Sequence, residues 1–185
     1  MRIFETDRLI ARSWSLDDAG SAFLMYGNPE VMRYLGADGA AATIPSIEAM
    51  QERLQQNLDK FATNPELKGY VWAALERKSD GAIVGTTMLK PMPFSDERPA
   101  TDIEVGWHLI PEYWGNGYAT ESGRGAIDYG FQKLGLSEIH SVAYSENSAS
   151  LKVMDRLGLR HLGKTSDYYN VEVEHYIITR DEWER

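Results

Sequence analysis

The feature that most constrains the fold is a strand, a glycine-containing turn and a helix that follow one another between residues 101 and 134. Gly115 and Gly117 stand in the turn, where the absence of a Cβ atom lets the backbone approach a ligand closely. The first amides of the following helix have no partner within the helix, and the helix dipole adds positive potential there. Together these properties predict a socket for a phosphate group.

Two glycines in such a turn are compatible with several kinds of site. A dinucleotide fold places Gly-x-Gly-x-x-Gly at its first strand–helix turn, whereas this turn lies past mid-chain and Thr120 stands where a third glycine is expected. A nucleoside triphosphatase loop needs Gly-Lys-Ser/Thr, which this turn lacks. A coenzyme A pyrophosphate site and an ordinary turn without a ligand remain as alternatives.

The rest of the chain mixes hairpins with strand–helix–strand units. Alternating apolar residues predict seven strands, at about 7–14, 70–76, 82–89, 101–110, 139–144, 160–166 and 171–178. Helical spacing and caps predict helices at about 16–26, 29–36, 47–61, 118–134 and 147–157, and a loop is expected at 39–45. This order implies an α/β (α+β) domain with a mixed, mostly antiparallel sheet of about seven strands flanked by helices.

The composition excludes several classes of protein. A length of 185 residues fits one domain, and the absence of cysteine excludes disulfides, thiolate metal sites and a cysteine nucleophile. A net charge of −9 disfavours nucleic acid as a partner, and it suits either solubility alone or a cationic substrate. The charged N-terminus and the lack of a long apolar run predict a cytoplasmic protein without a membrane span. The histidines lack ligand spacing, so no metal is expected at His108, His140, His161 and His175.

A set of segments forms a pattern when taken in order: Glu5–Leu9 with Asn28–Leu35, Pro111–Glu121, Asn147–Ser150 with Leu157–Leu159, and Tyr176 with Thr179–Trp183. The pattern resembles the GNAT superfamily of acetyl-coenzyme A-dependent N-acetyltransferases, and within it the branch of ribosomal-protein N-terminal-alanine acetyltransferases. The resemblance covers nearly the whole chain. It implies one N-acetyltransferase domain over 1–185, with an acceptor-side half at about 1–100, an acetyl-coenzyme A-binding core at about 101–160 and C-terminal strands at about 161–185.

The resemblance also implies which residues hold acetyl-coenzyme A as co-substrate. Backbone amides from Gly115 to Ala119 would hold the pyrophosphate, and the backbone at Leu109 would pair with the pantetheine arm as an added strand does. Trp114 stands where the wider superfamily often has Arg or Gln. This difference should have little effect on cofactor binding, because backbone amides rather than this side chain would hold the pyrophosphate. The cofactor residues expected by resemblance are Leu109, Trp114, Gly115, Asn116, Gly117, Tyr118, Ala119 and Asn147.

Acetyl transfer to an amine needs a proton acceptor, because a protonated amine is not a nucleophile. Asp102, Glu104, Gly106 and His108 share one face of the strand before the turn, since side chains alternate along a strand. The face is compatible with a catalytic site or with a solvated, salt-bridged surface. The resemblance favours Glu104 as the catalytic carboxylate. Asp102, nearer the loop edge, is a candidate to orient substrate. His108 is compatible with a base, a core histidine or a surface residue, and a structural role is favoured.

The departing thiolate needs a proton or a hydrogen bond. Many superfamily members place a tyrosine in the helix that Asn147 opens, but the matching position here is Met154, which cannot donate. The resemblance leaves Ser150 as the candidate acid, with a hydrogen bond to its own helix backbone as the alternative. Asn147 is expected to cap this helix and, by resemblance, to bond the pantetheine arm.

The sequence gives less information on the acceptor pocket than on the cofactor site. Its candidate lining is Trp14, Met32, Tyr34, Trp72 and Phe94, although core packing is the expected role of both tryptophans, and residues 91–100 are a candidate lid. The function implied is transfer of an acetyl group from acetyl-coenzyme A to a primary amine, on a protein N-terminus or a small molecule, by direct attack in a ternary complex. The alternatives are a non-catalytic acyl-coenzyme A binding or sensing module and a nucleotide-binding α/β protein. A monomer or a homodimer fits equally.

Overall fold

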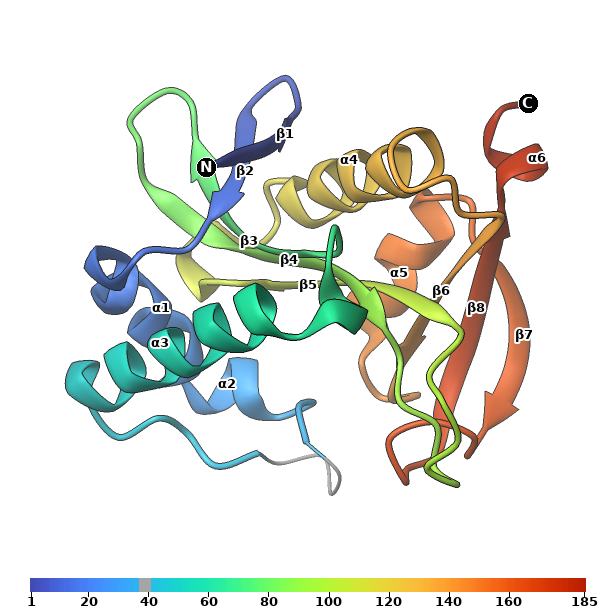
Figure 1. Cartoon of the computed structure of the whole chain (residues 1–185), viewed down its shortest axis with the longest axis horizontal. Coiled ribbons are helices and arrows are strands. Elements are labelled where there is room, and N and C mark those ends of the chain that lie inside the picture. Colours follow the sequence, from blue (N-terminus) through green and yellow to red (C-terminus); the bar gives the residue numbers. More distant parts are fainter. Residues whose placement is uncertain (37–40) are drawn as a thin grey trace.

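A computed structural model of the chain describes residues 1–36 and 41–185. The described strands form one open sheet in the order β1-β2-β3-β4-β5-β6-β8-β7 (Figure 1). Neighbouring strands are antiparallel except β5 and β6, which run parallel. The strands are β1 Arg2–Glu5, β2 Leu9–Ser13, β3 Val71–Arg77, β4 Ile83–Pro91, β5 Ile103–Leu109, β6 Glu138–Ala143, β7 Arg160–Thr165 and β8 Val173–Thr179.

The mixed, mostly antiparallel α/β sheet confirms the fold class, with eight strands where about seven are expected. The additional strand is β1, whose four residues are too few to show a clear alternation, and it pairs antiparallel with β2. The other seven strands lie where the sequence pattern predicts them, within a few residues at each end. The loop expected at 39–45 begins outside the described residues.

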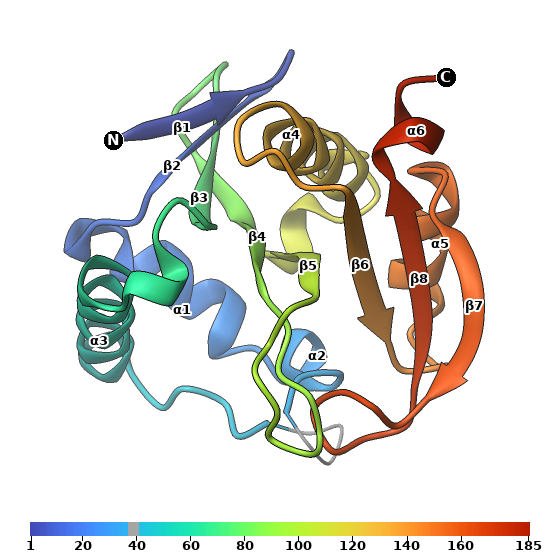
Figure 2. The ribbon, with the colours of Figure 1, turned by 45° about the vertical axis from the view of Figure 1, so that its right-hand side comes forward.

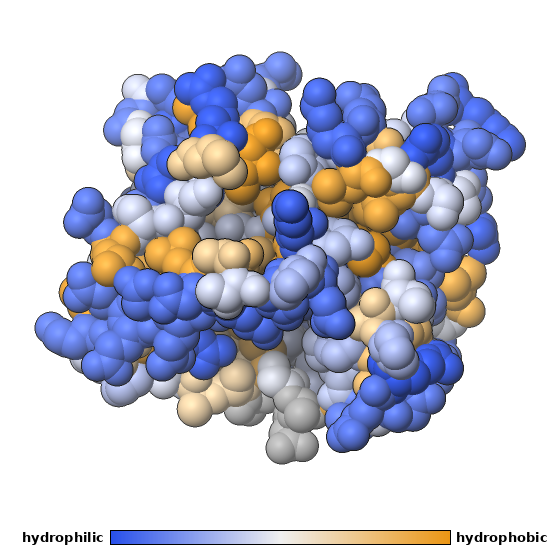
Figure 3. All heavy atoms as spheres, viewed as in Figure 1, coloured by the Kyte–Doolittle hydropathy of each residue, from blue (hydrophilic) through white to orange (hydrophobic). Residues whose placement is uncertain are grey.

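Helices cover both faces of the sheet. The helices α1 Ala19–Tyr26 and α3 Ile47–Thr63 pack on one face, with α2 Pro29–Met32 beyond α1, and α4 Tyr118–Gln132 packs on the other (Figure 1). The helix α5 Ser148–Arg156 follows β6, and the short α6 Arg180–Trp183 follows β8. Figure 3 shows hydrophilic side chains along the outer side of α3 and hydrophobic ones gathered between α3 and α4.

The alternation of side chains along β3 separates the two core clusters. Ala73 and Leu75 are buried against α4, whereas Ala74 between them is buried in the cluster with α1 and α3. The helix α4 approaches the sheet closely, because a Cβ at Gly130 would lie 2.7 Å from the Ile139 side chain. This close packing holds α4 against the strands β4 and β6.

The parallel strands β5 and β6 are joined at only one pair of residues, Glu104 with His140. Beyond that pair the strands separate, as Figure 2 shows from the side. The Ser141 hydroxyl still reaches the Val105 carbonyl at 2.9 Å, but Trp107 and Leu109 have no strand partner on this side. The opening between β5 and β6 positions the candidate site.

Candidate active site

A cleft of about 1490 Å³ runs along the opening between β5 and β6. The start of α4 and one face of α5 line one end, and α2 with the face of β5 that carries Glu104 lines the other. The cleft therefore connects the predicted phosphate socket to the predicted catalytic carboxylate.

The turn before α4 has the backbone geometry of an anion socket. Gly115 and Gly117 both have positive φ angles, 77° and 81°, which residues with a Cβ rarely adopt. Gly117 is the N-cap of α4, and no side chain caps the first amides of the helix. A Cβ added at Gly115 would meet no atom within 4 Å, so the socket is open. Free amides, an open approach and the positive end of a 15-residue helix suit a phosphate group.

Side chains hold the turn in this shape. The Trp114 indole nitrogen donates to the Leu109 carbonyl at 2.9 Å, and the Asn116 amide donates to the Tyr113 and Trp114 carbonyls at 3.1 and 3.0 Å. Tyr118 is buried beneath the Arg8 guanidinium. Seven of the eight predicted cofactor residues line the cleft, and Asn116 instead supports the loop; the seven are Leu109, Trp114, Gly115, Gly117, Tyr118, Ala119 and Asn147.

The edge of β5 that faces the opening presents backbone groups. The Ile110 amide donates to β4, at 3.0 Å from the Val84 carbonyl, so by alternation the Leu109 and Trp107 backbone groups point toward β6. The Leu109 carbonyl already accepts a hydrogen bond from the Trp114 indole. The Leu109 amide and both Trp107 backbone groups are thus left to pair with an extended ligand arm in the opening.

The helix α5 forms the opposite wall of the cleft. Asn147 caps it through a hydrogen bond from the Ser150 amide to Oδ1 at 3.2 Å, which confirms the expected cap and leaves the Asn147 Nδ2 group able to donate. Ser150 lines the cleft, and its hydroxyl has no hydrogen-bond partner among the described residues. Met154 is buried one turn further along and offers no proton.

Glu104 lies on the cleft wall with its side chain only 10% exposed. One carboxylate oxygen, Oε1, accepts hydrogen bonds from the Lys90 ammonium and from the Tyr169 hydroxyl. The other oxygen, Oε2, has no partner in the described part of the chain, and no side-chain polar atom there is both buried and unpartnered. Oε2 is therefore the oxygen that faces the cleft.

His108 lines the same cleft, two residues beyond Gly106. Its Nδ1 atom lies 3.1 Å from the Tyr26 hydroxyl, and the two rings meet edge to face. Burial, with a smaller effect of the Lys90 charge, lowers the pKa of His108 to about 4, so the ring is neutral near pH 7. Burial also raises the pKa of the Tyr26 hydroxyl. The neutral imidazole therefore adds no charge to the cleft wall.

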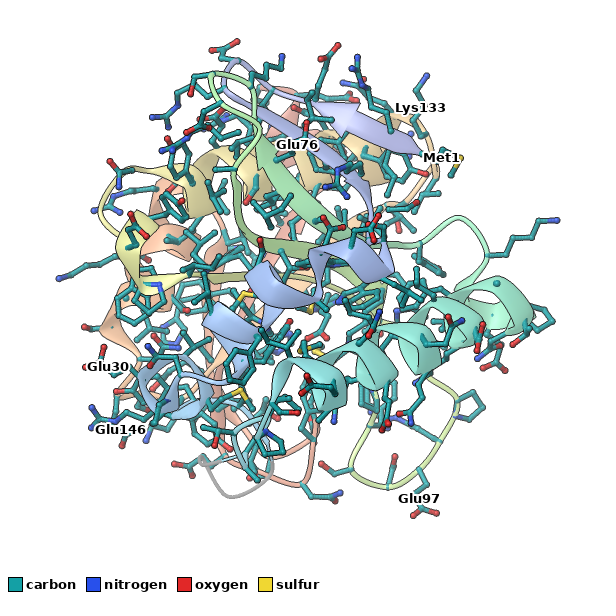
Figure 4. The ribbon with its side chains drawn as sticks, turned by 90° about the vertical axis from the view of Figure 1, so that its left-hand side faces the viewer. Met1, Glu30, Glu76, Glu97, Lys133 and Glu146 are labelled. Atoms are coloured by element: carbon teal, nitrogen blue, oxygen red, sulfur yellow. The ribbon has the colours of Figure 1, made fainter. Side chains whose placement is uncertain are left out.

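Several other predicted residues lie outside the cleft. Asp102 accepts a hydrogen bond from the Tyr168 hydroxyl at 2.6 Å. Phe94 stacks on Tyr168, which holds the 91–100 loop against the chain before β8. Glu97 in that loop lies well apart from Glu30 on the cleft wall in Figure 4, so the loop does not form a lid over this part of the cleft. Of the candidate pocket residues only Tyr34 lines the cleft, whereas Trp14, Met32 and Trp72 pack in the core or against it.

Comparison with known proteins identifies the family. Residues 8–160 match a protein family described as "Acetyltransferase (GNAT) domain". The chain belongs to the GNAT acetyltransferases. A GNAT relative from Bacillus subtilis, the uncharacterized N-acetyltransferase YoaA, is 31% identical over 166 residues, which cover 90% of this chain and 87% of the relative.

Solved GNAT structures share the fold. An acetyltransferase (GNAT family) from Bacillus anthracis superposes with a TM-score of 0.74 at 21% identity, covering 97% of this chain and 99% of that one. The ribosomal-protein-S5-alanine acetyltransferase from Vibrio fischeri superposes with a TM-score of 0.69 at 21% identity, covering 97% of each chain. At this identity the likeness concerns the fold alone.

Sequence reasoning missed three groups in this GNAT site. Lys90 and Tyr169 both donate to Glu104, and neither lies in a segment with a catalytic sequence pattern. Lys90 reaches Glu104 only because the register of β4 with β5 sets the two residues opposite each other. Tyr26, whose hydroxyl contacts His108, was not among the predicted site residues. The basic residues along the cleft were also missed, although basic residues near a phosphate socket are a usable signal; they are Arg8, Arg33, Arg124, Lys152 and Arg156.

A second sequence pattern is explained by the structure. Residues 158–165 have the spacing of a phosphate-binding loop, with Gly158, Gly163, Lys164 and Thr165 at the matching positions. Here the pattern runs into strand β7 rather than into a helix, and Lys164 pairs with Glu172 at 3.0 Å. Without a helix N-terminus the segment has no phosphate cradle.

The described residues contain no group of three or more side chains arranged to hold a metal ion. His140 and His175 do stack, with their nitrogens 2.9 Å apart, but no third ligand completes a site in the described chain. Among the described helices, none is both long enough and apolar enough to cross a bilayer.

Proposed function

We propose that this chain transfers an acetyl group from acetyl-coenzyme A to a primary amine by direct attack in a ternary complex. One observation carries the proposal: a single cleft holds an open amide socket at the start of α4, an unpaired strand edge on β5 and the exposed oxygen of a buried carboxylate, Glu104. The three features match the pyrophosphate, the pantetheine arm and the reacting amine of such a complex.

The proposed chemistry balances within this cleft. The protonated amine gives one proton to Glu104 Oε2, the neutral nitrogen forms a bond to the thioester carbonyl carbon, and the carbon–sulfur bond breaks. The second proton of the nitrogen goes to the coenzyme A thiolate, either directly while Ser150 donates a hydrogen bond to the sulfur, or by replacing a proton that Ser150 gives to it. Ser150 faces the cleft with an unpartnered hydroxyl among the described residues. The backbone groups of Trp107 and Leu109 keep the arm extended beside the reacting atoms.

The cleft restricts the class of acceptor. Its acceptor end carries the apolar side chains Val31, Leu35, Met88 and Val142 together with Glu30, Arg33 and Tyr34, and Glu104 is the buried carboxylate there. A primary amine on a slender, partly apolar carrier suits such an end, and a peptide N-terminus or a polyamine has that shape. The basic residues Arg8, Lys152 and Arg156 lie on the cleft wall and suit the phosphates of coenzyme A.

An acceptor screen tests the proposal. Acetyl-coenzyme A is mixed with the protein and with spermidine, kanamycin or a hexapeptide that begins with alanine, and free thiol is measured over time. We expect thiol release that depends on one of these amines, with one acetyl group found on the amine by mass spectrometry for each thiol formed. Tight coenzyme A binding without amine-dependent thiol release would instead support a binding or sensing module.

A further inference from the structure

Glu104 is held by two donors that reach it from different parts of the chain. Lys90 stands opposite it on β4, and Tyr169 lies in the segment between β7 and β8, 65 residues away. Both donate to the same oxygen, Oε1, and the Lys90 ammonium also donates to the Tyr169 oxygen at 3.1 Å. The three groups form a closed cluster behind the cleft wall.

Among the described residues, the Tyr169 hydroxyl has polar contacts with Glu104 and Lys90 alone, and Tyr169 does not line the cleft. Of the three cluster members only Glu104 lines the cleft in the described chain. Burial, and then the negative charge of Glu104, raise the pKa of the Tyr169 hydroxyl, so the phenol stays protonated and acts as a donor. Any effect of Tyr169 on an acceptor must therefore pass through the carboxylate.

The backbone conformation around Tyr169 places its hydroxyl within hydrogen-bond reach of Glu104. Tyr169 and Asn170 both have φ angles of 59°, in the left-handed region, which asparagine tolerates but tyrosine seldom adopts. The segment is held in place by hydrogen bonds from the Ser95 amide to the Asp167 carbonyl at 2.7 Å and from the Asn170 amide to the Ser95 hydroxyl at 3.0 Å. A tyrosine held in this conformation next to a buried cluster is typical of a functional segment.

We infer that Tyr169, together with Lys90, is a positioning residue for acetyl transfer: it fixes Oε1 of Glu104 so that Oε2 points to the acceptor amine. The inference rests on the proposed function and deepens it by assigning how the carboxylate is oriented. With Oε1 occupied by two donors, the carboxylate cannot rotate without losing both hydrogen bonds. The lone pairs of Oε2 then have a fixed direction into the cleft, as proton transfer requires.

Tyr169→Phe tests this role, with Tyr168→Phe as a matched control. Both changes remove one hydroxyl from the same segment, but Tyr168 donates to Asp102, outside the cleft, rather than to Glu104. At pH 7, and with whichever amine probe the parent acetylates, we expect Tyr169→Phe to lower kcat about tenfold, because a hydrogen bond to a charged group is lost. The affinity for acetyl-coenzyme A should stay within twofold, and Tyr168→Phe should resemble the parent in both.

Further measurements distinguish a role of Tyr169 in positioning Glu104 from a general loss of structure in the variant. The acidic limb of the pH–rate profile should move to higher pH in Tyr169→Phe, because the ionised carboxylate loses a stabilising donor. In a Glu104→Gln background, adding Tyr169→Phe should change the rate by less than twofold, because no carboxylate is left to orient. A crystal structure of Tyr169→Phe, which needs no acceptor, should show Glu104 rotated from its orientation in the parent.

The inference is overturned if Tyr169→Phe retains the parental rate and pH profile, or if it lowers the rate equally with and without Glu104. An unchanged Glu104 orientation in the variant crystal structure overturns it as well, whatever the activity. Failure of the proposed function has a different signature, because the parent chain itself would then release no thiol with any of the three amines.

Discussion

The two ends of the cleft are built in different ways. The proposed phosphate socket comes from one continuous stretch, the end of β5, the Gly115–Gly117 turn and the first turn of α4, and the groups proposed to bind the phosphates are backbone amides. The carboxylate cluster comes from three separate segments, and its groups are the side chains of Lys90, Glu104 and Tyr169. We therefore expect acetyl-coenzyme A affinity and the acetyl-transfer rate to depend on different parts of the sequence and to respond to different substitutions.

The largest effect on rate is expected at the carboxylate end. Glu104→Gln should lower the acetyl-transfer rate at pH 7 about 10²-fold or more, with little change in acetyl-coenzyme A affinity, because the amide cannot accept the amine proton. The deficit should shrink as the pH rises, since the amine then deprotonates without help. Steady-state rates from pH 6 to 9 measure both effects.

Asp102→Asn is the matched control for that variant. Asp102 lies on the same face of the strand, but its carboxylate is bonded by Tyr168 rather than exposed to the cleft. Its rate should stay close to that of the parent. Equal losses in the two variants would mean that the charge of this strand face matters and that Glu104 has no special role.

At the socket end the effect should fall on affinity. Gly117→Val should weaken acetyl-coenzyme A binding about 30-fold, because valine strains a backbone with a φ of 81° by about 1–3 kcal/mol and turns the first amides of α4 away. Calorimetry on the folded variant measures this loss. Gly135→Val is the control, since Gly135 has a φ of 72° beyond the other end of α4 and should lose stability but keep its affinity.

Ser150 lies between the two ends and should have a smaller effect. Ser150→Ala should lower the single-turnover rate about tenfold while affinity is kept, because the thiolate loses one hydrogen bond. Helix propensity does not interfere, since alanine favours the helix at least as well as serine. Adding Met154→Tyr should recover part of the loss if its hydroxyl reaches the sulfur. A parental rate in Ser150→Ala would assign the proton to water or to the acceptor.

The smallest effect concerns stability rather than turnover. The pKa of His108 is lowered to about 4 in the folded chain, below its ordinary value of about 6.5, so the unfolded state binds more protons between these values. Stability should therefore decrease as the pH falls from 7 to 5. We expect about 1 kcal/mol from His108, allowing for solvent in the cleft.

Urea unfolding at both pH values, for the parent and for His108→Gln, measures this contribution. The variant should lose less stability on acidification than the parent. If the parent and His108→Gln respond equally to pH, the ring is not buried as described.

The socket could be predicted from sequence because its information is local. Gly115, Gly117 and the alternation along 101–110 determine a turn and a helix start with no reference to the rest of the chain. Asn147 was likewise readable as a helix cap, and the capping pattern of Thr179 with Glu182 is also observed. The fold class followed from the order of such local elements.

The cluster around Glu104 could be predicted only in part. The alternation of β5 places Glu104 and His108 on one face, but it does not distinguish Glu104 from Asp102, which the structure places outside the cleft. Lys90 reaches Glu104 through strand register, and Tyr169 reaches it through a left-handed turn of two residues with ordinary side chains. Neither position carries a local sequence signal, because both depend on packing between distant segments.

The measurement that tests this division most directly is the single-turnover rate of acetyl transfer as a function of acetyl-coenzyme A concentration, for the parent, Gly117→Val and Glu104→Gln. We predict that Gly117→Val needs about 30-fold more acetyl-coenzyme A to reach a nearly parental plateau. Glu104→Gln should saturate at the parental concentration but reach a plateau about 10²-fold lower. If Gly117→Val lowers the plateau without changing the half-saturating concentration, or Glu104→Gln keeps the parental plateau, the account is contradicted.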